Sequence, residues 1–177
     1  AKIAEDKLSK LEEKNIRQVH CISSDDSDGE GIQEERCAMI KTGKFSNNKE
    51  FKAIIDSGAT SHFCSDRSLF VSMHKVRKRK IKVASANASF TSDKAGMICF
   101  SANGKTHKLH AIYAPEVDGL YVSVPKLDAA GYEIKIAAGE TRVYKSEKHE
   151  HPILIGRLIN GVYCIVISRK SEETMAP

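Results

Sequence analysis

Long apolar runs are missing from this sequence. It contains no stretch of about 18 apolar residues, the length that a membrane-spanning helix needs. The first residues, AKIAEDKLSKLEEKN, also lack the apolar segment of a secretory signal. We therefore expect a soluble, cytoplasmic protein with no membrane partner. Because the chain starts at Ala1 without methionine, we also expect it to be a piece of something longer.

Closely spaced cysteine pairs are missing as well. The five cysteines are scattered, and no two of them have the CxxC spacing: Cys21, Cys37, Cys64, Cys99 and Cys164. This pattern argues against a disulfide framework and against a zinc site, so we expect reduced thiols and no metal or organic cofactor. His149 and His151 could form a weak metal site, but their neighbours Lys148 and Glu150 favour a solvated loop.

Positive charge exceeds negative charge, with 28 lysines and arginines against 23 acidic residues. The excess is concentrated in Lys75–Lys80, a run that could contact nucleic acid. No aromatic residues are interleaved with this run, which favours a solvated, lysine-rich strand that resists edge pairing. Nucleic acid is thus the weaker of the two alternatives.

The texture of the chain changes near residue 37. Residues 1–36 are charged, with an acidic, serine- and glycine-rich stretch at 23–31, and predict a largely disordered linker that could start with a short helix over 3–15. From Cys37 onward, short apolar runs alternate with turn residues, which is typical of an all-β barrel. We predict a domain over 37–136 and a C-terminal β-hairpin extension over 137–177.

Local turn and cap signals fix several elements. Asn103-Gly104 and Asn160-Gly161 each separate two apolar runs and predict tight hairpins, because both residue types tolerate positive φ. Residues 125–131 open with proline and close with glycine, as a short helix does.

One aspartate stands where a carboxylate is costly. Asp56 directly follows the apolar strand residues Ile54 and Ile55, and a buried charge there must be paired, hydrogen-bonded or protonated. Two such carboxylates that share one proton provide an acid and a base together. Gly58 lets the backbone turn tightly beneath the carboxylate. The pattern indicates acid-base catalysis, although most Asp-Ser-Gly triplets only form an Asx-turn.

The residues after Asp56 extend this pattern. Asp56-Ser57-Gly58-Ala59 resembles the active-site turn of retropepsins, and residues 55–63, IDSGATSHF, are similar to the copia-type (Ty1/copia) branch of LTR retrotransposons. The resemblance covers roughly residues 50 to 165. It implies a retropepsin-like aspartic protease barrel with one short helix, which acts as a homodimer. The extension after residue 136 then leads toward the segment before integrase.

The resemblance also assigns roles to residues. Asp56 is the catalytic residue, and Ser57, Gly58, Ala59 and Thr60 form the active-site turn. The flap that covers the substrate includes Ala84, Ser85, Ala86, Asn87 and Ala88. Since the chain has no second D-[ST]-G, a second copy must supply the second aspartate. The implied function is an aspartic endopeptidase that processes its own gag-pol polyprotein inside a virus-like particle.

The sequence departs from the retroviral pattern at two linked positions. Retroviral enzymes carry Gly-Arg at the start of the short helix and an acidic residue after the turn, and the two pair. Here Ser123-Val124 and Thr60 take those places. We therefore expect a different way of stabilising the turn.

Three alternatives stay open. The first is a catalytically inactive retropepsin-like module that dimerises or binds peptides. The second is a Cys/His enzyme built on His62 and Cys64, for which no third group is positioned. The third is a nucleic-acid-binding segment of gag, although the zinc knuckle of such segments is absent from the sequence.

Overall fold

The computed structural model describes residues 33–37, 50–83, 88–145 and 150–169. These residues belong to one compact unit that begins at Ile32. The helix expected over residues 3–15 lies outside the described residues. The elements are β1 (Gln33–Cys37), β2 (Glu50–Asp56), β3 (Phe63–Cys64), the 3-10 helix η1 (Arg67–Leu69), β4 (His74–Val83), β5 (Ala88–Ala102), β6 (Lys105–Tyr113), β7 (Leu120–Ser123), α2 (Val124–Ala129), β8 (Tyr132–Ala137), β9 (Glu140–Lys145), β10 (Leu154–Ile159) and β11 (Val162–Arg169).

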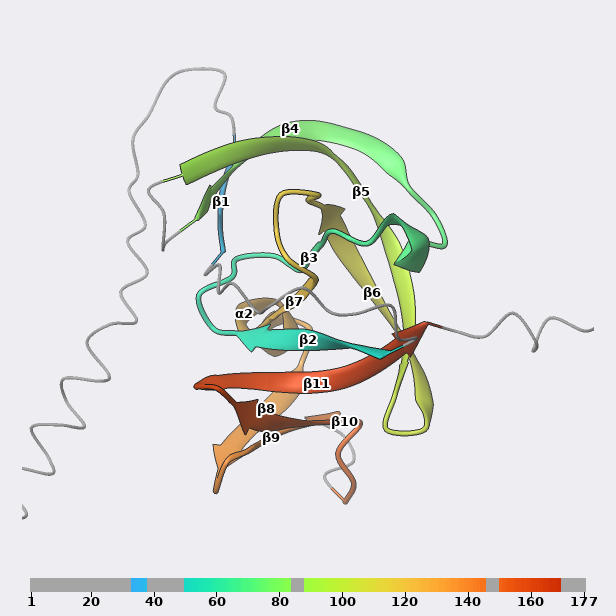
Figure 1. Ribbon diagram of the computed structural model, residues 1–177, viewed down its shortest axis with the longest axis vertical. Helices are drawn as coiled ribbons and strands as arrows, with labels where there is room; N and C mark the ends of the chain where they lie inside the picture. The colour runs from blue at the N-terminus through green and yellow to red at the C-terminus, as the bar shows by residue number, and fades with distance from the viewer. Residues whose placement is uncertain (1–32, 38–49, 84–87, 146–149, 170–177) are drawn as a thin grey trace, which may run out of the picture. The chain divides into compact units, whose positions relative to one another are not determined.

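The strands form one sheet that closes on itself (Figure 1). Its order is β1-β4-β5-β6-β3-β7-β2-β11-β10-β9-β8, and β5 also pairs with β11. That extra pairing, at Ser101 with Ser168 and Phe100 with Arg169, turns the run from β5 to β11 into a closed barrel. The strand β5 is 15 residues long, so it can serve the barrel at one end and the hairpin with β4 at the other. The predicted all-β fold with one short α-helix is confirmed.

Three tight hairpins rely on positive φ angles. Asn103-Gly104 has φ values of 51° and 72°, and Asn160-Gly161 has 51° and 81°, so both predicted turns are confirmed. Ala138-Gly139 forms the same kind of turn between β8 and β9, with φ values of 51° and 76°. Alanine rarely adopts this conformation, so this third turn could not be predicted from its residue types.

The centre of the barrel is β7, all four residues of which are buried. This strand runs parallel to β2 and antiparallel to β3. Leu120 and Val122 belong to one apolar cluster and Tyr121 to another, so both faces of β7 meet apolar side chains. Tyr121 and Phe63, which are opposite each other in these strands, are among the largest fully buried side chains. A fully buried strand is typically a continuous apolar run, as Leu120, Tyr121 and Val122 are here.

The helix α2 follows β7 without a loop. Ser123 caps its N-terminus, Pro125 occupies the first turn, and Gly131 follows its end with a φ of 85°. The predicted helix is therefore confirmed. Its place directly after β7 puts the helix start beside the end of β2, where Asp56 lies.

The C-terminal strands share the sheet with the rest of the barrel. The domain limit that we predicted between residues 136 and 137 falls inside β8. β11 pairs with β2 from Cys164 with Ile54 to Ser168 with Glu50, and Ala53, Ile54, Cys164 and Ile165 in this pairing are buried. Residues 33–36, which we had assigned to the linker, form most of β1. Within the described ranges, no helix has the length and apolar character needed to cross a membrane.

Candidate active site

Asp56 is the last residue of β2, a central strand of the barrel. The three residues before it are buried, and Asp56 itself is only 7% exposed. Its Oδ1 accepts a hydrogen bond of 2.7 Å from the backbone N–H of Gly58. The tight turn thus supplies a donor to a carboxylate that would otherwise be costly to bury. This contact also fixes the direction of the carboxylate.

The turn after Asp56 is tied to the junction between β7 and α2. Asp56 and Ser123 are opposite each other in the parallel strands β2 and β7, so the carboxyl ends of both strands meet. The fully buried Ser123 hydroxyl donates to the carbonyl of Ala59 at 2.5 Å and accepts from the N–H of Lys126 at 3.2 Å. One side chain therefore caps the helix and anchors the turn.

His62 holds the same junction from the other side. Its Nδ1 accepts a hydrogen bond of 2.9 Å from the N–H of Ser123. Burial, aided by the positive charges of Lys126 and His110, lowers the pKa of His62 from 6.5 to about 4. The ring is neutral at pH 7, as an acceptor at Nδ1 requires. These neutral hydrogen bonds stabilise the turn without the ion pair that the sequence lacks.

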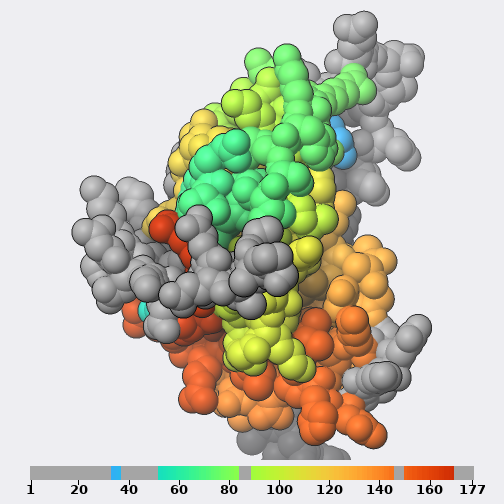
Figure 2. Space-filling view, turned by 90° about the vertical axis from the view of Figure 1, so that its right-hand side faces the viewer, coloured from blue at the N-terminus to red at the C-terminus, as the bar shows by residue number. Residues whose placement is uncertain are grey.

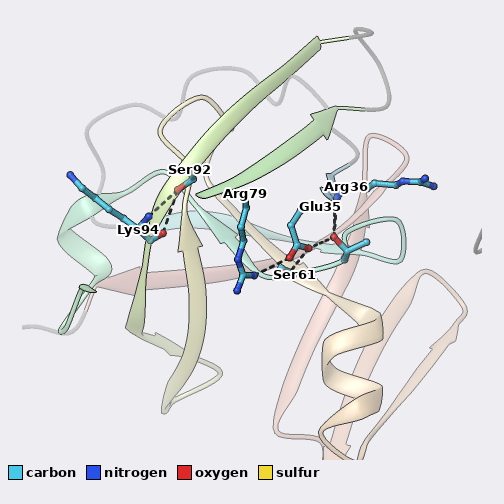
Figure 3. Close-up of polar contacts among 7 residues, drawn as sticks. Glu35, Arg36, Ser61, Arg79, Ser92 and Lys94 are labelled. Carbon is cyan, nitrogen blue, oxygen red and sulfur yellow. Dashed lines mark hydrogen bonds and ion pairs between the residues drawn. The ribbon is translucent and has the colours of Figure 1, made fainter. Parts of the chain in front are cut away.

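Glu35 of β1 is a buried carboxylate that contacts the turn, and sequence reasoning missed it (Figure 3). Its Oε2 accepts hydrogen bonds from the hydroxyls of Thr60 and Ser61, the latter at 2.9 Å. Its Oε1 pairs with Nη1 of Arg79 on β4 at 2.9 Å. The backbone N–H of Thr60 also donates to the carbonyl of Arg36 at 3.0 Å. β1 thus joins the turn to β4.

The hairpin of β4 and β5 follows the turn in sequence, where a flap is expected. Its strands pair from Arg79 with Ser92 to Val83 with Ala88. Of the predicted flap residues, Ala88 is the first residue of β5, and residues 84–87 lie outside the described part. The flap therefore stays a prediction. Gly96, further along β5, has a packing role, since a Cβ there would lie 1.9 Å from the carbonyl oxygen of Ser72.

The basic run lies in β4, as the strand interpretation expected. Lys75, Arg77 and Lys78 are exposed, and β4 (green) is accessible on the face that Figure 2 shows. The expectation of an unpaired edge is wrong from Arg79 onward, because Arg79–Val83 pair with β1 on one side and with β5 on the other. The pairing of β4 with β1 includes an ion pair between Arg79 and Glu35, in which the Arg79 side chain is partly buried.

The thiol of Cys64 does not fit the Cys/His alternative. Burial raises its pKa to about 12, so the nucleophilic thiolate is not populated at neutral pH. His62 already uses Nδ1 to accept from Ser123. Neither group is arranged as an activated pair.

A cavity and a possible metal site remain to be compared with the predicted site residues. A cavity of about 410 Å³ is bordered by Phe100, Leu127, Tyr132 and Leu154, and it includes none of the predicted site residues. Among the described residues, no group of three or more His, Cys, Asp or Glu side chains is placed to hold a metal ion. His151 is exposed, and His149 lies outside the described residues.

Comparison with known proteins gives one match. Residues 53–132 match the model of a family described as the Pol polyprotein beta-barrel domain. The match spans Asp56, the turn, the β4–β5 hairpin and α2, and it fits the all-β barrel. No curated protein and no solved structure matches the chain significantly. The copia branch and the protease activity stay predictions. The family match supports a Pol polyprotein of a retrotransposon or retrovirus as the context of this chain.

Proposed function

We propose that this chain is the aspartic endopeptidase of a copia-type retrotransposon Pol polyprotein, with Asp56 as its catalytic residue. The observation that carries the proposal is the place of Asp56. Its carboxylate ends a central strand, is 7% exposed and is oriented by the N–H of Gly58. A buried carboxylate with a fixed donor, in a region that matches the Pol polyprotein beta-barrel domain, has the features of a general acid or base.

The reaction needs two carboxylates, and each chain supplies one. In a homodimer, the ionised Asp56 of one subunit takes a proton from a water molecule, which attacks the scissile carbonyl carbon. The protonated Asp56 of the other subunit donates a hydrogen bond to the carbonyl oxygen. The proton taken from water then passes to the leaving amine as the C–N bond breaks. The two carboxylates titrate as a pair.

The remaining parts of the site suit an extended peptide. The hydroxyl of Ser123 donates to the carbonyl of Ala59, which holds the backbone of the turn beside Asp56. β1 lies between this turn and the β4–β5 hairpin: it pairs with β4 and contacts Thr60. Peptides bind to such elements as an added strand. The substrate that we propose is the polyprotein itself, in a cytoplasmic virus-like particle.

Processing of a gag-pol fragment that contains this segment tests the proposal. Asp56→Asn keeps the shape of the side chain and removes its acid-base function, so we expect discrete products from the wild type and none from this variant. Asp128→Asn is the matched control, because Asp128 is exposed on α2, and it should cleave normally. If neither the wild type nor the control cuts at any concentration, the chain is a peptide-binding or dimerisation module instead.

A further inference from the structure

β1 is held in place as a bound peptide is held. Its described side chains at positions 33, 34 and 36 are exposed, and only Glu35 is buried. None of these side chains joins the apolar core. The strand is instead fixed by backbone pairing with β4 along one edge. Along the other edge, the Arg36 carbonyl accepts from the N–H of Thr60 and the Arg36 N–H donates to the Thr60 hydroxyl. At positions 33–36, hydrophobic burial, the main force that holds an integral strand, is missing.

The two partners of β1 are walls of the proposed active site. Thr60 lies four positions after Asp56, within the predicted active-site turn, and β4 is the first strand of the expected flap hairpin. Gln33 pairs with Arg79 and Cys37 with Val83, so β1 runs parallel to β4 toward the tip of that hairpin. A peptide that adds a strand between turn and hairpin would meet the same donors and acceptors.

The side chain of Glu35 lies in a pocket that suits a carboxylate. Two hydroxyls, of Thr60 and Ser61, donate to Oε2, and the guanidinium of Arg79 pairs with Oε1 at 2.9 Å. Figure 3 shows Ser61 and Arg79 beside this carboxylate. The buried Nε of Arg79 has no hydrogen-bond partner among the described residues, so the arginine has a donor left for a second acceptor.

Glu34, the acidic residue next to Glu35, has no comparable binding site. Glu34 pairs with Lys82 at 2.7 Å, but both side chains are close to half exposed. An ion pair of that kind contributes little, because water and salt screen it. Glu35, in contrast, is 4% exposed, and its carboxylate is bound by two hydroxyls and a guanidinium.

From these contacts we infer that Thr60, Ser61 and Arg79 form a glutamate-binding subsite for an extended peptide, and that β1 of the same chain occupies this subsite through Glu35. The inference rests on the proposed function, since it takes the turn after Asp56 as a wall of the peptide site. β1 therefore competes with peptides supplied in trans. The preferred substrates carry a glutamate at the position that Glu35 now fills.

Peptide binding to the full chain tests this inference. The probe is a fluorescent peptide with the sequence of residues 30–40, in which Cys37 is replaced by serine, and the readout is its anisotropy. The Glu35→Ala chain, with its subsite emptied, should bind this probe at least about tenfold more tightly than the wild type. The Glu34→Ala chain is the matched control and should bind it as the wild type does.

The same two substitutions, Glu35→Ala and Glu34→Ala, are also made in the peptide probe. A peptide with Glu35→Ala should bind the Glu35→Ala chain at least about tenfold more weakly than the parent peptide, because it leaves three donors without a carboxylate. A peptide with Glu34→Ala should bind within about threefold of the parent, since its screened pair contributes little. Adding Arg79→Ala to the chain should reduce the difference between the parent peptide and the Glu35→Ala peptide, because one of the three donors is then missing.

Three results would overturn the inference. One is equal binding of the parent and Glu35→Ala peptides, and another is no binding by a folded Glu35→Ala chain. The third is unfolding of both the Glu35→Ala and Glu35→Gln chains by circular dichroism, which would make β1 an integral strand. Binding is read without cleavage. Glutamate-dependent binding by a chain that never cuts would therefore keep the subsite and reject the endopeptidase.

Discussion

Protonation of His62 should destabilise the fold as the pH falls. The imidazole is 8% exposed, and its Nδ1 accepts from the N–H of Ser123. Its pKa is about 4 in the folded chain and 6.5 in a solvated one, so the folded state binds fewer protons between these values. Stability is therefore full above about pH 6.5 and is lost progressively toward pH 4.

The size of this loss follows from the two pKa values. At 1.36 kcal/mol for each pH unit between them, His62 costs roughly 3 kcal/mol once it is fully protonated. Between pH 7 and pH 4.5 the loss is about 2 to 3 kcal/mol. That is a large share of the stability of a typical domain.

Urea unfolding at pH 7 and pH 4.5 measures this effect. His62→Asn retains an oxygen that can accept from Ser123 but does not titrate, so its free energy of unfolding should fall by about 2 kcal/mol less than that of the wild type. His107 and His110 also have lowered pKa values. Their contributions to the pH dependence cancel in the comparison, because both proteins contain them. His151→Asn changes an exposed histidine and should follow the wild type. The same pH dependence in wild type and His62→Asn would refute the reasoning.

Three further predictions test the packing around the site. Gly96→Ala should cost about 3 kcal/mol or more in unfolding free energy, because its Cβ meets the backbone of Ser72, whereas Gly104→Ala, with open space and a φ of 72°, should cost about 1 kcal/mol. Ser123→Ala should cost about 2 kcal/mol, since it removes both the helix cap and the bond to Ala59; the exposed Ser89→Ala is its control and should change the urea midpoint little. Native Cys64, with a pKa of about 12, should resist iodoacetamide at pH 8 by mass spectrometry and react in urea; rapid native labelling would contradict its burial.

Much of the fold could be predicted because its signals are local. YEIKIA predicts the strand that the structure places over Tyr132–Ala137. The two Asn-Gly turns and the helix between Pro125 and Gly131 follow from residue types that favour particular φ angles. Burial of Asp56 follows from the apolar residues that precede it. In each of these cases, the neighbours in sequence carry the physical cause.

The missing parts depend on contacts between distant residues. QEERC has no apolar alternation, so nothing in β1 itself predicts a strand. Its conformation depends on β4, more than 40 residues away, and on the hydroxyls of Thr60 and Ser61. The hydrogen bonds of His62 and Ser123, which stabilise the turn where retroviral enzymes have an ion pair, likewise depend on tertiary structure. The sequence showed that both charged partners were absent, and only the fold shows what takes their place.

Mixing of subunits tests the central claim, that two Asp56 carboxylates from two chains form one site. A fixed amount of wild type would be mixed with increasing Asp56→Asn, under conditions in which dimers form and exchange, and cleavage of a gag-pol fragment would be measured. In a ninefold excess of the variant, only about one-tenth of the wild-type chains have a wild-type partner. We predict that activity falls to about that level, while Asp128→Asn in the same excess does not reduce it. Unchanged activity in the presence of Asp56→Asn would contradict the shared site.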